Sequence, residues 1–263
     1  MPLELSGRIV VITGAGSGIG RALALQAARE GMKLALADND AAALRDVADE
    51  ARVLGASVFQ QSVDVRSRRE LDEFARDVNK ISGGVALVFA NAGVMRAATS
   101  WLQSPEEWDL VLDVNVKGAV HTASAFIPTL LAQQKPSRIV FTGSTSAFSP
   151  RPHLVSYSAS KHALWGIAES MHLELADIDG GKVGVSFLAP AGVKTPIADA
   201  PGAPQQDMVR GMLQNFGMPP EDLAEITFAA LKEDRFWILP HPEFKAALEK
   251  RTAWVKTEQD PGK

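Results

Sequence analysis

The chain of 263 residues is 46% hydrophobic and 22% charged, and its formal net charge is -4. These proportions are typical of a globular protein, and one α/β domain can span this length. Cysteine is absent, which excludes disulfides and Cys-ligated zinc. The acidic balance and the lack of a Lys/Arg run argue against binding to nucleic acid.

The histidines show no spacing that suits a metal site, so we expect no metal; they are His121, His153, His162, His172 and His241. The N-terminus lacks a basic segment followed by an apolar one, and no apolar run reaches the roughly 18 residues that a membrane helix needs. We therefore expect a soluble, cytoplasmic protein without a membrane partner.

Residues 9–38 predict a strand, a tight turn, a helix and a second strand. The β-branched run 9–12 leads into the glycine cluster 13–20, and an Ala/Leu-rich helix follows over 21–30. Glycines let the backbone approach a pyrophosphate closely, and the helix N-terminus then offers free N–H groups. The next strand ends on Asp38, where a dinucleotide-binding unit places the acid that holds the adenosine ribose. The alternative is an ordinary glycine-rich loop.

The remaining segments alternate between helix and strand. Hydrophobic periodicity predicts helices over 40–54, 67–83, 104–132, 157–178 and 221–232 and from Pro242 onward, and strands over 58–63, 86–90, 138–142, 183–188 and 236–239. Two helices should begin at capping boxes, Ser67 with Glu70 and Ser104 with Glu107. The alternation predicts one Rossmann-like α/β domain over residues 1–263, a doubly wound parallel β-sheet flanked by helices, with its ligand at the carboxyl ends of the strands.

Residues 190–220 are rich in Pro, Gly, Ala and Gln and directly follow a predicted strand. We expect one long irregular loop there, and long loops in compact domains are usually functional. We interpret this loop as a lid that orders over cofactor and substrate, with Arg210 as an accessible trypsin site when the lid is open. Residues 259–263 are expected to be frayed.

Apolar residues surround the predicted helix 104–132 almost completely, so one sheet cannot cover all of them. Trp165, Met171 and Leu175 on the helix 157–178 add to this surplus. We therefore expect a second copy of the chain to cover these residues in a homo-oligomer.

The only tyrosine, Tyr157, precedes Lys161 by one helical turn, so both lie on one face of their helix. Ser144 follows the preceding strand, and Asn91-Ala92-Gly93 follows the strand before that. A tyrosine is more often a packing residue, but these neighbours favour a catalytic role here.

These motifs resemble those of the short-chain dehydrogenase/reductase family in its compact single-domain form. The resemblance rests on residues 13–20, Asp64-Val65, Asn91–Gly93, Asn115 with Gly118, Ser144, Tyr157 with Lys161, and residues 190–195, in this order and spacing. The chain departs from the family pattern at Ala191, where glycine is usual, and at Gly143, where a second serine is frequent. Both departures concern small residues and affect details of the pocket.

The resemblance implies that Tyr157 is the acid/base, that Lys161 activates it and binds the ribose, and that Ser144 orients the substrate oxygen. Asn115 would anchor a water-mediated proton relay, and tetramers or dimers are the implied assemblies. The implied NAD-binding residues are Gly14, Ser17, Gly18, Ile19, Gly20, Asp38, Asp64, Val65, Asn91, Ala92, Gly93, Tyr157, Lys161, Pro190, Val193 and Thr195.

The chemistry of the Tyr157–Lys161 pair leads to the same expectation. A lysine charge about 4 Å from the phenol contributes up to about 4 kcal/mol at an effective dielectric of 20, and a positive nicotinamide ring acts in the same direction. We therefore expect a phenolate near neutral pH.

The substrate should be a small, mostly apolar alcohol or ketone. Its wall is expected from Ser144, Val94, Met95, Phe148, His153, Leu154, Met208, Met212 and Phe216. The sequence thus predicts an NAD-dependent oxidoreductase that interconverts a secondary alcohol and a ketone. One alternative is a reductase of 3-oxoacyl thioesters, which would favour NADPH and a basic entrance. Another is a non-catalytic redox sensor that binds NADH.

Overall fold

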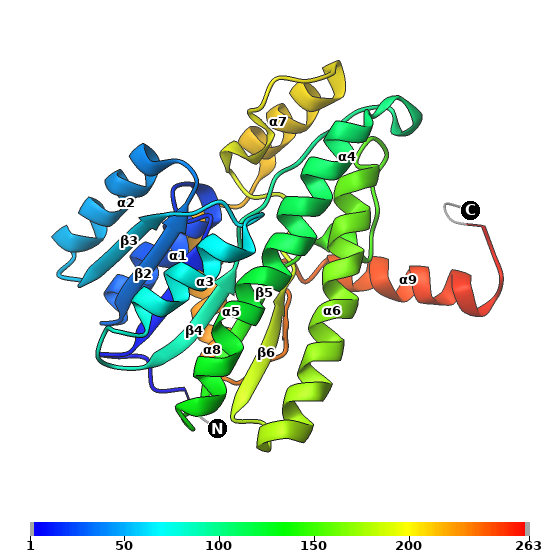
Figure 1. Ribbon diagram of the computed structural model, residues 1–263. Helices are drawn as coiled ribbons and strands as arrows, with labels where there is room; N and C mark the ends of the chain where they lie inside the picture. The colour runs from blue at the N-terminus through cyan, green and yellow to red at the C-terminus, as the bar shows by residue number, and fades with distance from the viewer. Residues whose placement is uncertain (1–2, 261–263) are drawn as a thin grey trace.

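The computed structural model describes residues 3–260 and contains a seven-stranded parallel sheet covered by helices on both faces (Figure 1). The strand order is β3-β2-β1-β4-β5-β6-β7. The strands are β1 Ile9–Thr13, β2 Lys33–Asp38, β3 Val58–Ser62, β4 Val85–Ala90, β5 Ser137–Thr142, β6 Val183–Leu188 and β7 Trp237–Ile238. This confirms the predicted fold, and most strand bounds agree with the sequence to within one residue.

The central strands are buried because both of their faces are apolar, as a parallel sheet between two helical layers requires. On β1, Val10 and Ile12 belong to one core, whereas Ile9 and Val11 belong to the other. The first core packs under α1 Gly18–Arg29, α2 Ala41–Val53 and α8 Pro220–Lys232. The second packs under α3 Arg68–Val78, α5 Gly118–Ala132 and α6 Val155–Asp179. The chain changes direction across the sheet between β1 and β4, and such a switch point opens a crevice at the strand ends.

The predicted helix over 104–132 is interrupted by one π-helical turn. Helix α4 spans Pro105–Leu112, the π turn spans Asp113–Lys117, and α5 continues from Gly118. The capping box at Ser104 and Glu107 is present. The turn contains Asn115, whose side chain is completely buried. Insertions of this kind often mark functional positions in helices.

The expected irregular loop over 190–220 contains a regular helix, so this prediction was wrong. A short 3-10 turn, Pro196–Ala198, precedes helix α7, Pro204–Phe216. Proline at the first helical position starts α7 well, whereas the sequence analysis took the local Pro and Gly residues as breakers. The two ends of the segment are joined, because Lys194 N donates to Met218 O at 2.9 Å and Met218 N to Gly192 O at 2.9 Å.

Helix α9, Phe244–Lys256, extends from the body of the molecule beside α6 (Figure 1). Arg251 Nη1 ties it to the body through Ala147 O at 3.2 Å and His162 Nε2 at 2.6 Å. Residues 259 and 260 have no regular structure, and the other residues expected to fray, 261–263, lie outside the described chain. Between residues 3 and 260, no helix has both the length and the hydrophobicity to cross a bilayer.

Candidate active site

A cleft of about 420 Å³ lies where the strands end. It runs from Asp38 and Asp64, past the glycine cluster and Gly93, to Tyr157. All the residues that the resemblance implied for NAD line it: Gly14, Ser17, Gly18, Ile19, Gly20, Asp38, Asp64, Val65, Asn91, Ala92, Gly93, Tyr157, Lys161, Pro190, Val193 and Thr195.

The glycine cluster forms a tight turn that side chains would obstruct. Gly18 has φ +51°, in the left-handed region, and a Cβ on it would lie 2.9 Å from the Thr195 side chain. A Cβ on Gly20 would lie 1.9 Å from Gly14 O. Helix α1 begins at Gly18, and no acidic residue occupies its first turn. The start of α1 lines the cleft. Because no carboxylate competes for its N-terminal N–H groups, these groups can bind an anion such as a pyrophosphate.

Asp38 ends β2 and holds the glycine cluster in place. One oxygen, Oδ2, accepts from Gly16 N at 2.8 Å, and Oδ1 accepts from Asp40 N at 3.0 Å. The carboxylate borders the cleft, so its charge and remaining acceptor positions face any ribose bound there.

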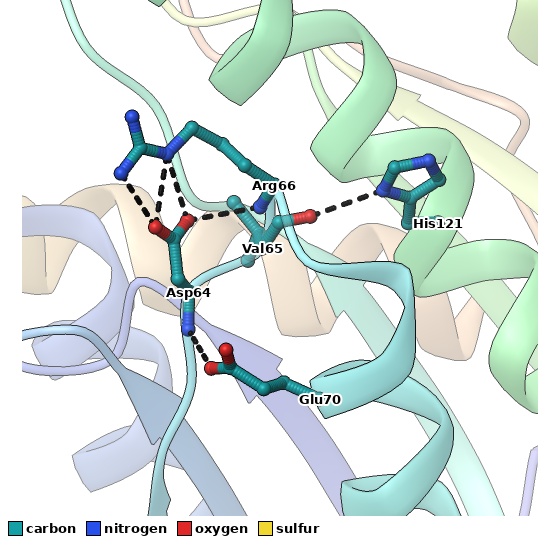
Figure 2. A network of polar contacts seen from close by, with 5 residues as sticks. All are labelled: Asp64, Val65, Arg66, Glu70 and His121. Atoms are coloured by element: carbon teal, nitrogen blue, oxygen red, sulfur yellow. Dashed lines mark hydrogen bonds and ion pairs between the residues drawn. The ribbon is translucent and has the colours of Figure 1, made fainter.

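The loop after β3 is pinned from two helices (Figure 2). Glu70 Oε2 on α3 accepts from Asp64 N at 2.9 Å, and the ring Nδ1 of His121 on α5 lies 3.3 Å from Val65 O. The guanidinium of Arg66 holds both carboxylate oxygens of Asp64, which lowers the pKa of that carboxyl. The predicted capping box at Ser67 is therefore only half formed: Ser67 Oγ accepts from Glu70 N, but the Glu70 carboxylate is used at Asp64.

Asn91 joins the ends of three strands. Its Nδ2 donates to Thr13 O at 3.0 Å, and its Oδ1 accepts from Thr142 Oγ1 at 3.1 Å. Thr13 Oγ1 accepts in turn from Asn91 N at 3.1 Å. The Asn91 side chain thus stabilises the floor of the cleft through bonds within the protein, in addition to lining it.

Asn115 lies behind the cleft and fixes the wall at Val94. Its Oδ1 accepts from Val94 N at 2.8 Å, and its Nδ2 donates to Val94 O at 3.0 Å and to Ser160 Oγ at 3.0 Å. These bonds engage the side-chain amide of Asn115. Any part that Asn115 has in proton transfer therefore falls to its backbone. The π turn provides this geometry, because its extra residue places the amide of Asn115 within reach of both partners.

Tyr157 and Lys161 line one end of the cleft, and Ser144 lies beside Tyr157. Ser144 follows β5 and hydrogen-bonds the Tyr157 phenol through its side chain. Lys161 Nζ lies 5.5 Å from the centre of the Tyr157 ring and donates to Thr142 O at 2.7 Å. Both Tyr157 and Lys161 are buried. Tyr157 can thus donate or accept a proton, with the hydroxyl of Ser144 as its hydrogen-bond partner and the amine of Lys161 nearby as a cation.

Burial controls the protonation of this site. It raises the pKa of Tyr157 to about 12, against the opposing effect of the Ser144 hydrogen bond, and lowers the pKa of Lys161 to about 7. The phenol of the protein alone therefore keeps its proton at neutral pH. The predicted phenolate also relied on a positive nicotinamide ring, so it stays a prediction for the NAD-bound protein. Removing two charged forms from water costs more than their mutual attraction returns.

The structure brings only some of the residues predicted for the substrate wall to the cleft. Val94 and Met95 line the cleft, and Leu154 packs in the same cluster as Met95 and Tyr157. The other residues lie elsewhere: Phe148 packs edge-on against Trp165, His153 accepts a backbone bond from Ala98, and Met208, Met212 and Phe216 are 51%, 53% and 87% exposed. On α7 it is Leu213 that reaches the cleft, because the exposed three follow the opposite i, i+4 face.

Two polar residues of the site carried no signal in the sequence. Gln206 on α7 is 1% exposed; its Oε1 accepts from Ala97 N at 2.7 Å, and its Nε2 donates to Ala198 O at 3.1 Å. Arg96 lines the cleft beside Met95.

The departure from the family pattern at Gly143 has a physical reason, since a Cβ there would lie 2.1 Å from the Phe187 ring.

Comparisons with known proteins agree with this geometry. A family sequence model described as "short chain dehydrogenase" matches residues 8–206. A 1-deoxy-11-beta-hydroxypentalenate dehydrogenase of Streptomyces exfoliatus is 34% identical over 94% of this chain and 87% of its own length. A short-chain dehydrogenase/reductase from Burkholderia phymatum, solved in complex with NAD, is 35% identical with a TM-score of 0.94 over 99% of this chain and 98% of that one. A 3-ketoacyl-(acyl-carrier-protein) reductase from Brucella melitensis, solved with NADH, is 29% identical with a TM-score of 0.75 over 86% and 91%.

Proposed function

Since this chain belongs to the short-chain dehydrogenase/reductase family and is an oxidoreductase, we propose that it interconverts a secondary alcohol and a ketone with NAD as its cofactor. One observation carries the proposal: Tyr157 and Lys161 line the cleft that also holds the glycine cluster and Asp38, and Ser144 hydrogen-bonds Tyr157. A hydride cofactor and an acid/base pair would thereby share one enclosed site.

The residues present fit NAD. The glycine cluster leaves room that any Cβ would fill, and the N-terminus of α1 suits the pyrophosphate. Asp38 suits a ribose diol and would repel a 2'-phosphate. The similar Burkholderia phymatum protein has been solved with NAD, which supports the same assignment.

Bound NAD would accept or supply the hydride at the substrate carbon. Tyr157 exchanges the proton at the substrate oxygen, and Ser144 donates a hydrogen bond that orients the same oxygen. In the reducing direction, the raised pKa of Tyr157 keeps its proton available until the ketone oxygen gains charge. Lys161 offsets the charge that then develops on Tyr157.

Two alternatives are weaker. A reductase of 3-oxoacyl thioesters, as the Brucella melitensis relative is named, would be served by free cations at the entrance. Of the two cations in residues 190–220, Lys194 and Arg210, Arg210 is paired with Asp199 and Asp207, so this segment offers one lysine and no basic cluster. A non-catalytic sensor of NADH would not need Ser144, Tyr157 and Lys161 together.

A screen of secondary alcohols with NAD, and of ketones with NADH, tests the proposal through the absorbance of NADH. We expect turnover of at least one apolar secondary alcohol or its ketone, and turnover at least about a hundredfold slower in the Tyr157→Phe variant. NADH binding without turnover of any alcohol or ketone in a broad panel would favour the sensor.

A further inference from the structure

Arg96 is a cation in the wall of the cleft that the proposed chemistry does not use. It follows Met95, whose side chain packs in one cluster with Tyr157, and Arg96 is itself one of the residues that line the cleft. We propose that the substrate carries a carboxylate on an apolar body and that Arg96 binds this carboxylate. The inference rests on the oxidoreductase function proposed above, because it assigns a substrate class to the same site.

The guanidinium of Arg96 has donors to spare. Its only side-chain hydrogen bond to a described residue joins Nη1 to the neighbouring Met95 O at 2.8 Å, and no carboxylate whose side chain the structure describes pairs with it. An arginine side chain has five N–H donors in a planar fork that matches a carboxylate. Most of that fork is therefore available to a ligand.

The other cations that line the cleft are already engaged. Arg66 donates to both oxygens of Asp64, from Nε to Oδ1 at 3.0 Å and from Nη2 to Oδ2 at 2.6 Å. Lys161 donates to Thr142 O and lies beside Tyr157. An anionic group of the substrate would therefore find its free partner at Arg96.

The surroundings of Arg96 favour a charged hydrogen bond. Val94, Leu110, Ile197 and Leu213 line the same cleft with apolar side chains. A substrate body that packs against them excludes water, and a charge pair is stronger where water is excluded. An apolar wall with one free guanidinium therefore selects for amphipathic acids.

The backbone beneath Arg96 is fixed. Gln103 Nε2 donates to Arg96 O at 3.3 Å, and the flanking Met95 and Ala97 are 6% and 3% exposed. Ala97 N is held by Gln206 Oε1 at 2.7 Å. A side chain on a fixed backbone loses less freedom when it binds a ligand, which favours affinity.

The test uses oxo-octanoates with the ketone at successive positions along the chain, each paired with its primary amide. The series covers different separations between carboxylate and ketone. Binding to the NADH-loaded protein is measured by NADH fluorescence, and kcat/KM by NADH absorbance. We expect the wild type to prefer the best acid over its amide by at least about tenfold, as a hydrogen bond to a charged group implies.

Arg96→Met should bring this preference close to one, and Arg96→Lys should keep part of it. Arg45→Met removes the same charge from the exposed side of α2 and should leave the preference unchanged. Affinity for NADH without ketone should be unaltered in all three variants, which also shows that each is folded.

Three results would overturn the inference: a wild type that binds amides as well as acids at every position, an acid preference that survives Arg96→Met, or an Arg96→Met protein that loses affinity for NADH itself. The last would assign Arg96 to the cofactor. Arg96-dependent binding of an acid without any turnover would support the inference and overturn the proposed function instead.

Discussion

At the scale of single residues, we propose that the carboxylate of Asp38 determines which dinucleotide fits. Its charge borders the cleft while it also accepts from Gly16 N. A 2'-phosphate about 5 Å away would meet roughly 3 kcal/mol of repulsion per unit charge at a dielectric of 20, so NAD should be preferred by at least about a hundredfold.

Asp38→Asn tests this prediction, because it removes the charge and keeps an oxygen that can accept from Gly16 N. The preference for NAD over NADP, measured as the ratio of kcat/KM values, should fall at least about tenfold. Asp46→Asn, on the exposed side of α2, is the control. Equal use of NAD and NADP by the wild type would contradict this role for Asp38.

The protonation of Tyr157 can be measured directly, because it is the only tyrosine in the chain. Burial raises its pKa to about 12, so the folded protein holds this proton more tightly than the unfolded chain. Tyrosinate absorbance of the folded protein should appear only near pH 12, and Ser144→Ala should move it higher. Titration of folded protein at or below pH 10 would disprove the effect of burial.

The raised pKa also affects stability. Because the folded state holds the Tyr157 proton more tightly than the unfolded chain, the free energy of unfolding should fall as the pH rises from about 10 to 12.

Residues with a spacing signature could be found from the sequence, and others could not. Tyr157 and Lys161 stand one helical turn apart, and Asp38 ends a strand at a set distance from the glycines. Gln206 and Arg96 have no such pattern, because their roles arise from contacts between segments far apart in the chain. The effect of burial on the pKa of Tyr157 could not be predicted for a similar reason, since the cost of burial depends on the packed structure.

At the scale of elements, α7 is held over the substrate end of the cleft by Gln206. The amide bonds Ala97 N on one side and Ala198 O on the other. Gln206→Leu keeps the volume but leaves buried backbone groups without partners, which costs about 1–3 kcal/mol each. Because Arg210 lies within α7, trypsin can cleave after it only when the helix opens.

We expect Gln206→Leu to speed that cleavage by at least about tenfold and to raise the KM for substrate more than that for NADH. Gln205→Leu is the matched control, since Gln205 has only a 3.4 Å contact to Thr99. If the two variants are cleaved at the same rate, Gln206 is not what holds α7 closed.

Helix α7 was missed from the sequence because its buried face is short and partly polar. Gln206, Val209 and Leu213 face inward, whereas the more apolar series Met208, Met212 and Phe216 faces outward. A pattern that assumes apolar residues inside therefore gives the wrong face. The π turn at Asn115 was also missed, because one inserted residue hardly alters a helical pattern that is apolar all round.

At the scale of the whole molecule, alternation of apolar strands and helices was sufficient to predict the sheet. Part of the oligomer argument was not correct: Leu175 is buried within the chain, and Trp165 packs against Phe148 and Trp237. The large apolar residues of α6 that are exposed are instead Leu173 and Ile178, at 67% and 68%. The sequence could not show which side chains the chain itself covers.

These exposed residues, with the half-buried apolar side chains of α4 and α5, still predict a homo-oligomer. Burial of such a surface stabilises association at about 25 cal/mol per Å² before the costs of ordering. Light scattering at micromolar concentration should give a dimer or tetramer, and Leu173→Glu combined with Ile178→Glu should shift it toward monomer. A monomeric wild type would contradict this.

The central claim is that Tyr157 exchanges the proton of a hydride-transfer reaction. The most direct test compares wild type and Tyr157→Phe with NAD and a secondary alcohol that the wild type oxidises, following NADH in a single turnover. Loss of the only phenol should slow NADH formation by at least about a hundredfold while affinity for NADH stays within about twofold. Formation of NADH at the wild-type rate in Tyr157→Phe would contradict the account.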